Sequence, residues 1–357
     1  VLPQTEEVPA LVTGVAAGPD RMVAVGQRAC ERTRDGALGD CWGQAWISTD
    51  GLVWEAVDAR TSGLDLGSFD YVLHGPELGL GGVAYGPAGF VAYGWAVPTG
   101  SIDAEAQTAT IQPTLWRSDD GTSWSRLQSP EGFSTTGLML TGPWLRAITG
   151  TDDGYLLGGT VYGTPAPRAA IWASPDGLDW TLAGPDEVFD IGAYIDTMEV
   201  PIAGGIAAFA VEPSTDEGAG GVIAVGSSCP SATAGAGPRG RAWKKWDWTT
   251  GDCRARIWRS DDGVTWKAGA FRDASGSRVD GYAATTVAAA EDGLLVGVYP
   301  RRVLYSGEDS AWAASPDRKV GRQLALAASG VGFDAFIPKC EVADCRRKML
   351  AVWSSAD

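Results

Sequence analysis

Short apolar runs alternate with turn-forming residues along the whole chain. Five runs of Val, Ile, Leu, Ala and Tyr end in glycine, at residues 23–26, 91–94, 156–159, 223–226 and 294–297. A turn signal precedes each run, such as Gly18, Pro19 and Asp20 before the first, and another apolar segment precedes each turn. Runs of this length with Gly, Pro and Asp between them are typical of β-hairpins. The pattern predicts pairs of antiparallel strands and no long helix.

A second pattern follows the apolar runs, and it reads Trp-x-Ser-x-Asp-Gly-x-x-Trp. Complete copies stand at residues 46–54, 116–124, 172–180 and 258–266. We align a fifth copy, with one extra residue and neither the Gly nor the second Trp, on residues 312–317, and a sixth on residues 353–357. Sequence repeats of this length indicate a repeated structural unit.

Each repeat predicts four strands, with a tight turn after the first, a variable loop after the second and the Ser-x-Asp-Gly turn after the third. Four antiparallel strands repeated six times predict an all-β chain that forms a six-bladed antiparallel β-propeller with Asp-box turns. We expect a single domain over residues 1–357. The expected blades are residues 9–58, 80–128, 145–184, 204–270, 283–322 and, incomplete, 323–357.

The repeated turn resembles the Asp box of the BNR repeat, which occurs in sialidases and related β-propellers. This resemblance covers the whole chain and implies that each box lies between the third and fourth strands of a blade. The Asp carboxylate can accept hydrogen bonds from backbone N–H groups of the turn, and Gly supplies a positive φ. We therefore assign a structural role to the box residues Ser48, Asp50, Ser118, Asp120, Ser174, Asp176, Ser260 and Asp262.

The composition of the chain limits the functions that it can have. The chain has 357 residues, is 45% hydrophobic and carries a formal charge of −16, which argues against binding nucleic acid through phosphate contacts. The single histidine, His74, excludes a multi-histidine metal site, so we expect neither a metal nor a cofactor. No apolar run is long enough to span a membrane. The chain starts at Val1 without a basic and apolar leader, and we read it as a mature or trimmed product.

Six cysteines fall in three of the expected loops between second and third strands. Because two lie in each loop, we predict the pairs Cys30–Cys41, Cys229–Cys253 and Cys340–Cys345. The alternative is six free thiols in a reducing compartment. Three local disulfides would indicate an extracytoplasmic protein, secreted or attached to the cell surface.

Tryptophan and arginine gather in the same loops. Of the 16 Trp, six lie outside the repeat frame, in or beside these loops or the connections between blades. The loop windows, residues 27–44, 96–114, 161–169, 228–256, 299–310 and 339–348, hold sixteen basic and eleven acidic residues. We expect this face, opposite the Asp boxes, to bind a ligand. The candidate ligand-binding residues are Trp42, Trp95, Trp243, Trp246, Trp248, Arg241, Arg254, Arg301 and Arg302. The alternative is that these side chains only pack long loops.

Three functions fit this reading. The first is a non-catalytic module that binds a glycan or a protein, with no nucleic-acid partner. The second is a sialidase-like or other glycoside hydrolase, which in the sialidases uses a Tyr nucleophile, an Asp acid/base and three Arg. That family carries its first Arg in an F/Y-R-I-P motif near the N-terminus, whereas this chain has no Arg before Arg21. The third is a subunit of an extracellular assembly. We favour the binding module, assign no catalytic residue, and note that the Gly, Ala, Arg and Trp usage suggests a bacterial source.

Overall fold

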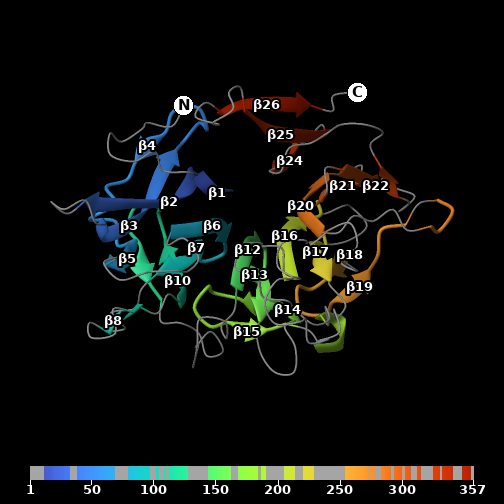
Figure 1. Ribbon diagram of the computed structural model, residues 1–357, viewed down its shortest axis with the longest axis horizontal. Helices are drawn as coiled ribbons and strands as arrows, with labels where there is room; N and C mark the ends of the chain where they lie inside the picture. The colour runs from blue at the N-terminus through green and yellow to red at the C-terminus, as the bar shows by residue number, and fades with distance from the viewer. Residues whose placement is uncertain are drawn as a thin grey trace, which may run out of the picture. The chain divides into compact units, whose positions relative to one another are not determined.

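In the computed structural model, the described part of the chain is built from β-strands joined by turns and short connections (Figure 1). The structure describes residues 12–32, 38–68, 79–96, 102–103, 108–109, 112–127, 144–161, 168–183, 186–189, 205–213, 220–228, 254–272, 274–277, 283–290, 293–299, 302–306, 312–314, 325–329, 332–340 and 348–354. Within these residues the only helix is the short 3₁₀ turn η1, Asp186–Phe189. The prediction of an all-β chain is therefore confirmed. The chain divides into two compact units, residues 1–157 with 172–182 (unit 1) and residues 158–171 with 183–357 (unit 2).

The first sheet of unit 1 is an antiparallel meander with one additional strand. Its strands follow the order β1-β2-β3-β4, and β5 pairs with β3. Their bounds are β1 Val12–Ala17, β2 Met22–Arg32, β3 Leu38–Ser48, β4 Glu55–Ala56 and β5 Asp65–Ser68. The turn with the first Asp box separates β3 from β4, as the resemblance implied. No sequence signal predicted β5.

Two more four-stranded antiparallel sheets follow. The second has the order β6-β7-β10-β11, with a separate hairpin, β8–β9, between β7 and β10. The third has the order β12-β13-β14-β15, and its strand segments belong to both units. The bounds are β6 Gly79–Gly86, β7 Gly89–Ala96, β8 Ile102–Asp103, β9 Thr108–Ala109, β10 Gln112–Ser118, β11 Ser125–Arg126, β12 Trp144–Thr151, β13 Gly154–Val161, β14 Arg168–Ser174 and β15 Thr181–Leu182.

Unit 2 repeats the same arrangement. Two sheets have four strands, in the orders β16-β17-β18-β19 and β20-β21-β22-β23, and the last described sheet has three, β24-β25-β26. The bounds are β16 Gly205–Val211, β17 Val222–Ser228, β18 Arg254–Ser260, β19 Lys267–Gly269, β20 Ala283–Ala290, β21 Gly293–Tyr299, β22 Arg302–Ser306, β23 Trp312–Ala314, β24 Ala325–Ser329, β25 Gly332–Cys340 and β26 Lys348–Ser354.

Each unit has its own apolar core. In unit 1, Val23, Phe90 and Trp116 are almost completely buried and belong to one cluster that spans the first two sheets. In unit 2, Ile223, Phe271 and Val296 belong to a second cluster. Burial of such side chains is the main driving force for packing one sheet on the next.

The four complete Asp boxes adopt one geometry. In the first, the Asp50 Oδ1 atom accepts hydrogen bonds from the N–H groups of Leu52 and Val53, both at 2.8 Å, and Trp54 Nε1 donates to the Gly51 carbonyl at 3.0 Å. Gly51 has φ 72°, in the left-handed region that favours glycine. The box glycines Gly121, Gly177 and Gly263 have φ 74°, 75° and 71°. Identical hydrogen bonds recur around Asp120, Asp176 and Asp262.

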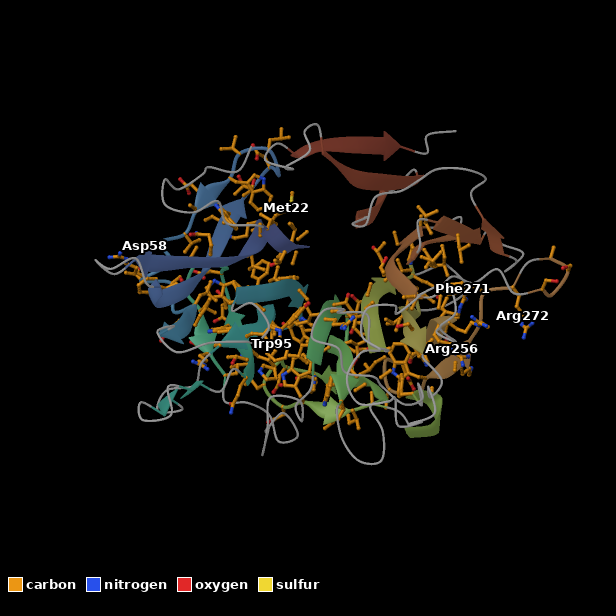
Figure 2. All side chains as sticks on the ribbon, viewed as in Figure 1. Met22, Asp58, Trp95, Arg256, Phe271 and Arg272 are labelled. Carbon is orange, nitrogen blue, oxygen red and sulfur yellow. The ribbon has the colours of Figure 1, made fainter. Side chains whose placement is uncertain are left out.

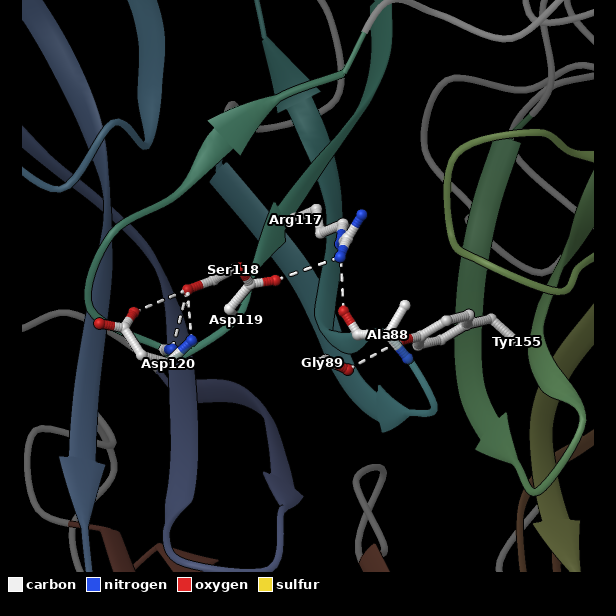
Figure 3. Close-up of polar contacts among 8 residues, drawn as sticks. Ala88, Gly89, Arg117, Ser118, Asp119, Asp120 and Tyr155 are labelled. Atoms are coloured by element: carbon white, nitrogen blue, oxygen red, sulfur yellow. Dashed lines mark hydrogen bonds and ion pairs between the residues drawn. The ribbon is translucent and has the colours of Figure 1, made fainter.

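The turn of the second sheet is also tied to its neighbour within unit 1 (Figure 3). The Tyr155 hydroxyl, on β13, donates to the Gly89 carbonyl at 2.8 Å and accepts from the Ala88 N–H at 3.1 Å. Arg117 Nε donates to the Ala88 carbonyl at 3.0 Å. These bonds hold the β6–β7 turn between the second Asp box and the third sheet.

The structure corrects the alignment of the fifth repeat. Trp312 lies in β23, the fourth strand of its sheet, whereas the first Trp of each complete box lies in a third strand. Ser306 pairs with Leu294 as the box residue Ser48 pairs with Met22. The fifth repeat therefore starts at Leu304, which takes the place of the first Trp, and Trp312 takes the place of the second Trp. The expected box over residues 312–317 was therefore misplaced by one strand.

Two of the expected loop windows are largely strand. The window 27–44 belongs mostly to β2 and β3, which extend the hairpin beyond the other sheets. The window 299–310 contains β22, so Arg302 lies in a strand paired with Val298. The many charged residues of these windows concealed strands that cross-strand pairing stabilises.

Candidate functional site

The structure describes four of the nine candidate ligand-binding residues at least in backbone. Trp42 is in β3, Trp95 in β7, Arg254 in β18 and Arg302 in β22. Arg254 is half-buried and pairs with Ser228 in unit 2. The other candidates lie outside the described residues; they are Trp243, Trp246, Trp248, Arg241 and Arg301.

Trp42 is the best-defined candidate. Its ring is half-buried, and the guanidinium carbon of Arg60 lies 5.4 Å from the ring centroid. This distance is typical of a cation–π interaction, which orients the planar guanidinium over the aromatic face. Trp42 stands near the middle of β3, and Ser48 of the Asp box stands at its end.

A backbone strap over residues 58–68 carries Arg60 to this position (Asp58 is labelled in Figure 2). Asp58 opens the strap, because its Oδ1 atom accepts from the Arg60 N–H at 3.0 Å and its carbonyl accepts from the Ser62 N–H at 3.0 Å. The Leu64 carbonyl accepts from the Gly43 N–H at 2.8 Å. Leu64 and Leu66 are fully buried in the core of unit 1. Two buried leucines and a backbone bond therefore fasten the strap beside Trp42.

The strap also places a carboxylate beside Trp42, and an arginine of β11 interacts with that carboxylate. Asp65 is exposed and pairs with Trp42 across β3 and β5. Burial lowers the pKa of Arg126, and the negative charge of Asp65 acts in the opposite direction, so these groups interact. Arg126 Nη2 also donates to Thr114 Oγ1 at 3.4 Å. We call Trp42, Arg60, Asp65 and Arg126 the Trp42 site.

This arrangement combines a flat apolar ring with directed polar groups. The two guanidinium groups supply several fixed N–H donors, and the Asp65 carboxylate supplies acceptors. A ligand with an apolar face and hydroxyl groups on its edge matches such a set, and so does a partner protein with an exposed polar loop. The Trp42 site can therefore offer a ligand both a stacking surface and polar contacts. It contains one carboxylate, Asp65, and two arginines.

Trp95 is the other described tryptophan candidate, and it lies in β7 of the second sheet (Figure 2). It is half-buried, pairs with Gly79 and Pro113, and is the second-last residue of β7. Its strand, β7, starts at Gly89, next to the β6–β7 turn that Arg117 binds through the Ala88 carbonyl. Trp95 therefore lies near the end of its strand, whereas Trp42 lies in the middle of β3, six residues before Ser48.

Tyr93, two residues before Trp95, is a buried phenol and not an activated nucleophile. Its side chain is 4% exposed, and its ring lies against Gly81 and Gly82 of β6, where any Cβ would collide with it. Burial raises the pKa of Tyr93 well above its usual value, although the charge of Arg146 acts to lower it. The phenol therefore stays protonated at neutral pH.

The box carboxylates are occupied by their own turns. Backbone hydrogen bonds from Val53 and Leu52 lower the pKa of Asp50, and those from Leu178 and Asp179 lower the pKa of Asp176. Bonds from Thr265 and Val264 place the pKa of Asp262 far below its usual range. Partial burial acts to raise the pKa of Asp120, but bonds from Thr122 and Ser123 outweigh it. A carboxylate held ionised by its own turn is poorly suited to act as a general acid.

The structure adds two general observations. Among the described residues, no cluster of three His, Cys, Asp or Glu side chains has the spacing of a metal site. In the same part of the chain, no helix has the length and apolar character needed to cross a membrane.

Sequence reasoning missed Arg60 and Arg126 as members of the site. Arg60 follows β4 and Arg126 is in β11, both outside the loop windows used to sort charge. Asp65 was missed as well, because it lies in β5, a strand that the repeats do not predict.

Comparisons with known proteins assign no function. No protein-family model matches the sequence, and no curated protein matches it. A protein of unknown function from Dyadobacter fermentans aligns over 98% of this chain and 95% of its own, with 14% identity and a TM-score of 0.49. An α-L-arabinanase from Cellvibrio cellulosa aligns over 97% of this chain and 92% of its own, with 11% identity and a TM-score of 0.40. An ulvan lyase of polysaccharide lyase family PL25 aligns over 93% and 79%, with 8% identity and a TM-score of 0.42.

At these identities and scores, the class of the protein rests on its own strands. It is an all-β protein built from repeated four-stranded antiparallel sheets, the unit from which β-propellers are made.

Proposed function

We propose that this chain is a six-bladed Asp-box β-propeller that binds a glycan without turning it over. The observation that carries the proposal is the Trp42 site in unit 1, where the Arg60 guanidinium lies over the Trp42 ring and Asp65 is the strand partner of Trp42. Asp65 also interacts electrostatically with Arg126. The repeated sheets and the four identical box turns support the propeller. A sugar presents an apolar C–H face to an aromatic ring and hydroxyl groups to donors and acceptors around it.

Two features favour binding over hydrolysis, and both concern carboxylates. Those of the four boxes are engaged by backbone N–H groups of their own turns. Glycosidases of the common type need two carboxyl groups in defined positions. The Trp42 site contains one, next to Arg126.

We propose an extracytoplasmic location, secreted or at the cell surface, on the cysteine pattern. The pairs Cys30–Cys41, Cys229–Cys253 and Cys340–Cys345 remain proposals. Disulfides that close loops beside a binding face would reduce the entropy that the loops lose on binding.

The test is a glycan array probed with the purified oxidised protein, with a fluorogenic sialoside in the same buffer. Trp42→Ala and Arg60→Ala should each weaken the strongest array signal by at least tenfold. The control is Arg272→Ala, which removes an exposed arginine of unit 2 and should leave the signal unchanged. Unchanged glycan binding in both Trp42→Ala and Arg60→Ala would mean that the Trp42 site does not bind the glycan.

The other outcomes separate the alternatives. Turnover of the sialoside would replace the binding module by a hydrolase. Silence on the array and with the sialoside would shift the function to a protein partner or to a subunit of an extracellular assembly.

A further inference from the structure

The hairpin of β2 and β3 carries two cysteines at one register position. Cys30 pairs with Cys41, and Ala29 pairs with Trp42 at the adjacent position. Residues directly opposite in an antiparallel ladder have Cα atoms about 4.5 or 5.5 Å apart, depending on the type of pair. A disulfide joins Cα atoms about 4.4–6.8 Å apart. Both pair types therefore meet the backbone requirement for a disulfide.

The same stretch of β3 is paired on both sides. Cys41 also pairs with Gly67 of β5, and Asp40 pairs with Ser68. The β2–β3 register shifts on each side of the cysteine pair, between Gly26 and Ala29 and again between Cys30 and Arg32. Register shifts interrupt the ladder and loosen the pairing at these points. A covalent link at this position would fix a hairpin segment that the ladder alone holds less firmly.

We propose that Cys30 and Cys41 form a disulfide that fixes the strand bearing Trp42, so that the redox state of this hairpin controls the Trp42 site. The consequence for binding rests on the proposed function, whereas the link and its effect on the strand do not. The oxidant is a low-molecular-weight disulfide such as oxidised glutathione. One thiolate attacks its S–S bond and releases one glutathione thiolate; the second thiolate then attacks the mixed disulfide and releases the other. Two protein thiols are oxidised and one glutathione disulfide is reduced.

Peptide mapping tests the link directly. Trypsin cleaves after Arg28, Arg32, Arg34 and Arg60, so Cys30 falls on peptide 29–32 and Cys41 on peptide 35–60. Folded protein equilibrated with oxidised glutathione and digested without reductant should yield these peptides joined, and dithiothreitol should separate them. Two alkylated, unlinked peptides, or a link from either cysteine to another one, would overturn the proposal.

Hydrogen–deuterium exchange tests the effect on the strand. In the double variant Cys30→Ser, Cys41→Ser, amides of residues 38–44 should exchange at least tenfold faster than in the oxidised parent. Cys340→Ser is the matched control, because Cys340 pairs with Lys348 in unit 2, and it should leave residues 38–44 unchanged. Equal exchange in the double variant and the parent would contradict the positioning role, even with the link present.

The outcomes also separate this inference from the proposed function. A joined peptide pair with faster exchange in the double variant, but no glycan binding by the parent, would keep the disulfide and reject the function. Glycan binding that is equally tight in the parent and in the double variant would reject redox control of the site.

Discussion

At the scale of the residue, one carboxylate organises each box turn. The Oδ1 atom of Asp120 accepts from the Thr122 and Ser123 N–H groups at 2.8 and 3.0 Å. The Ser118 hydroxyl donates to the same atom at 3.1 Å (Figure 3). Its neighbour Asp119 is 87% exposed and forms an ion pair with Arg117 at 3.2 Å. Asp120 therefore stabilises the turn through several hydrogen bonds, whereas its neighbour Asp119 forms an exposed ion pair.

Asp120→Ala should destabilise the fold more than Asp119→Ala does. The first substitution leaves two turn N–H groups without their acceptor, which costs about 1 kcal/mol for groups that water can still reach. The second removes one exposed ion pair, which contributes little. Equilibrium denaturation in urea measures both free energies of unfolding. Equal losses in the two variants would contradict the turn-holding role of Asp120.

Acid should destabilise the protein through these same carboxylates. The pKa values of Asp50, Asp120, Asp176 and Asp262 are all lowered in the folded state. The unfolded chain therefore binds protons first as the pH falls below about 4, and stability decreases on the way to the lower folded pKa values. Their contribution is complete above pH of about 4. Melting temperatures measured from pH 6 to pH 2 should fall most steeply below pH 4, and less steeply in Asp120→Ala.

At the scale of the element, the strap over residues 58–68 explains how Arg60 and Asp65 reach Trp42. The Ser62 carbonyl accepts from the Trp124 N–H at 2.7 Å, which joins the strap to the second Asp box. Gly63 has φ 84°, and a Cβ there would collide with the Trp124 carbonyl oxygen. The strap thus needs glycine at this position both for its backbone conformation and for its close approach.

Gly63→Ala should displace the strap and weaken the Trp42 site. The collision with backbone atoms and the strained φ act together, and the expected loss of stability is about 2 kcal/mol. Glycan binding at the Trp42 site should weaken at least as much as in Arg60→Ala. Gly276→Ala is a control with a similar φ of 79° and no neighbouring atom within 4 Å of its Cβ. Comparable losses of binding in both glycine variants would argue against the close approach as the cause.

Elements differ in how well the sequence predicted them. The four complete boxes marked the turns after β3, β10, β14 and β18, because a turn with a local carboxylate and a glycine is encoded within nine residues. The fifth box was misaligned because Leu304 replaces its first Trp, which left Trp312 as the visible aromatic residue. Strand β5 and the site at Trp42 depend on the docking of the strap in the core, which no local spacing encodes.

At the scale of the whole molecule, charge and fold class could be read from the chain, but the residues of the proposed Trp42 site only in part. The net charge of −16 and the six repeats are properties of the sequence itself. Trp42 was identified because it stands outside the repeat frame. Its cation partner, Arg60, was not, since a cation–π contact arises between segments that packing brings together. Closure of the propeller would involve all of the sheets together, and it predicts the radius of gyration of the whole chain.

A closed six-bladed propeller of 357 residues should have the radius of gyration of one compact domain, about 21 Å. Closure brings the last sheet beside the first, so that no sheet is left with an apolar face toward water, and the scattering is that of a single body. If the two compact units were separate domains joined by mobile connections, the radius would be larger and the distance distribution would show two maxima. Small-angle X-ray scattering of the oxidised protein, extrapolated to infinite dilution, measures both quantities. A value well above 21 Å from a monomer would reject closure, while leaving the Trp42 site intact because all of its residues belong to unit 1.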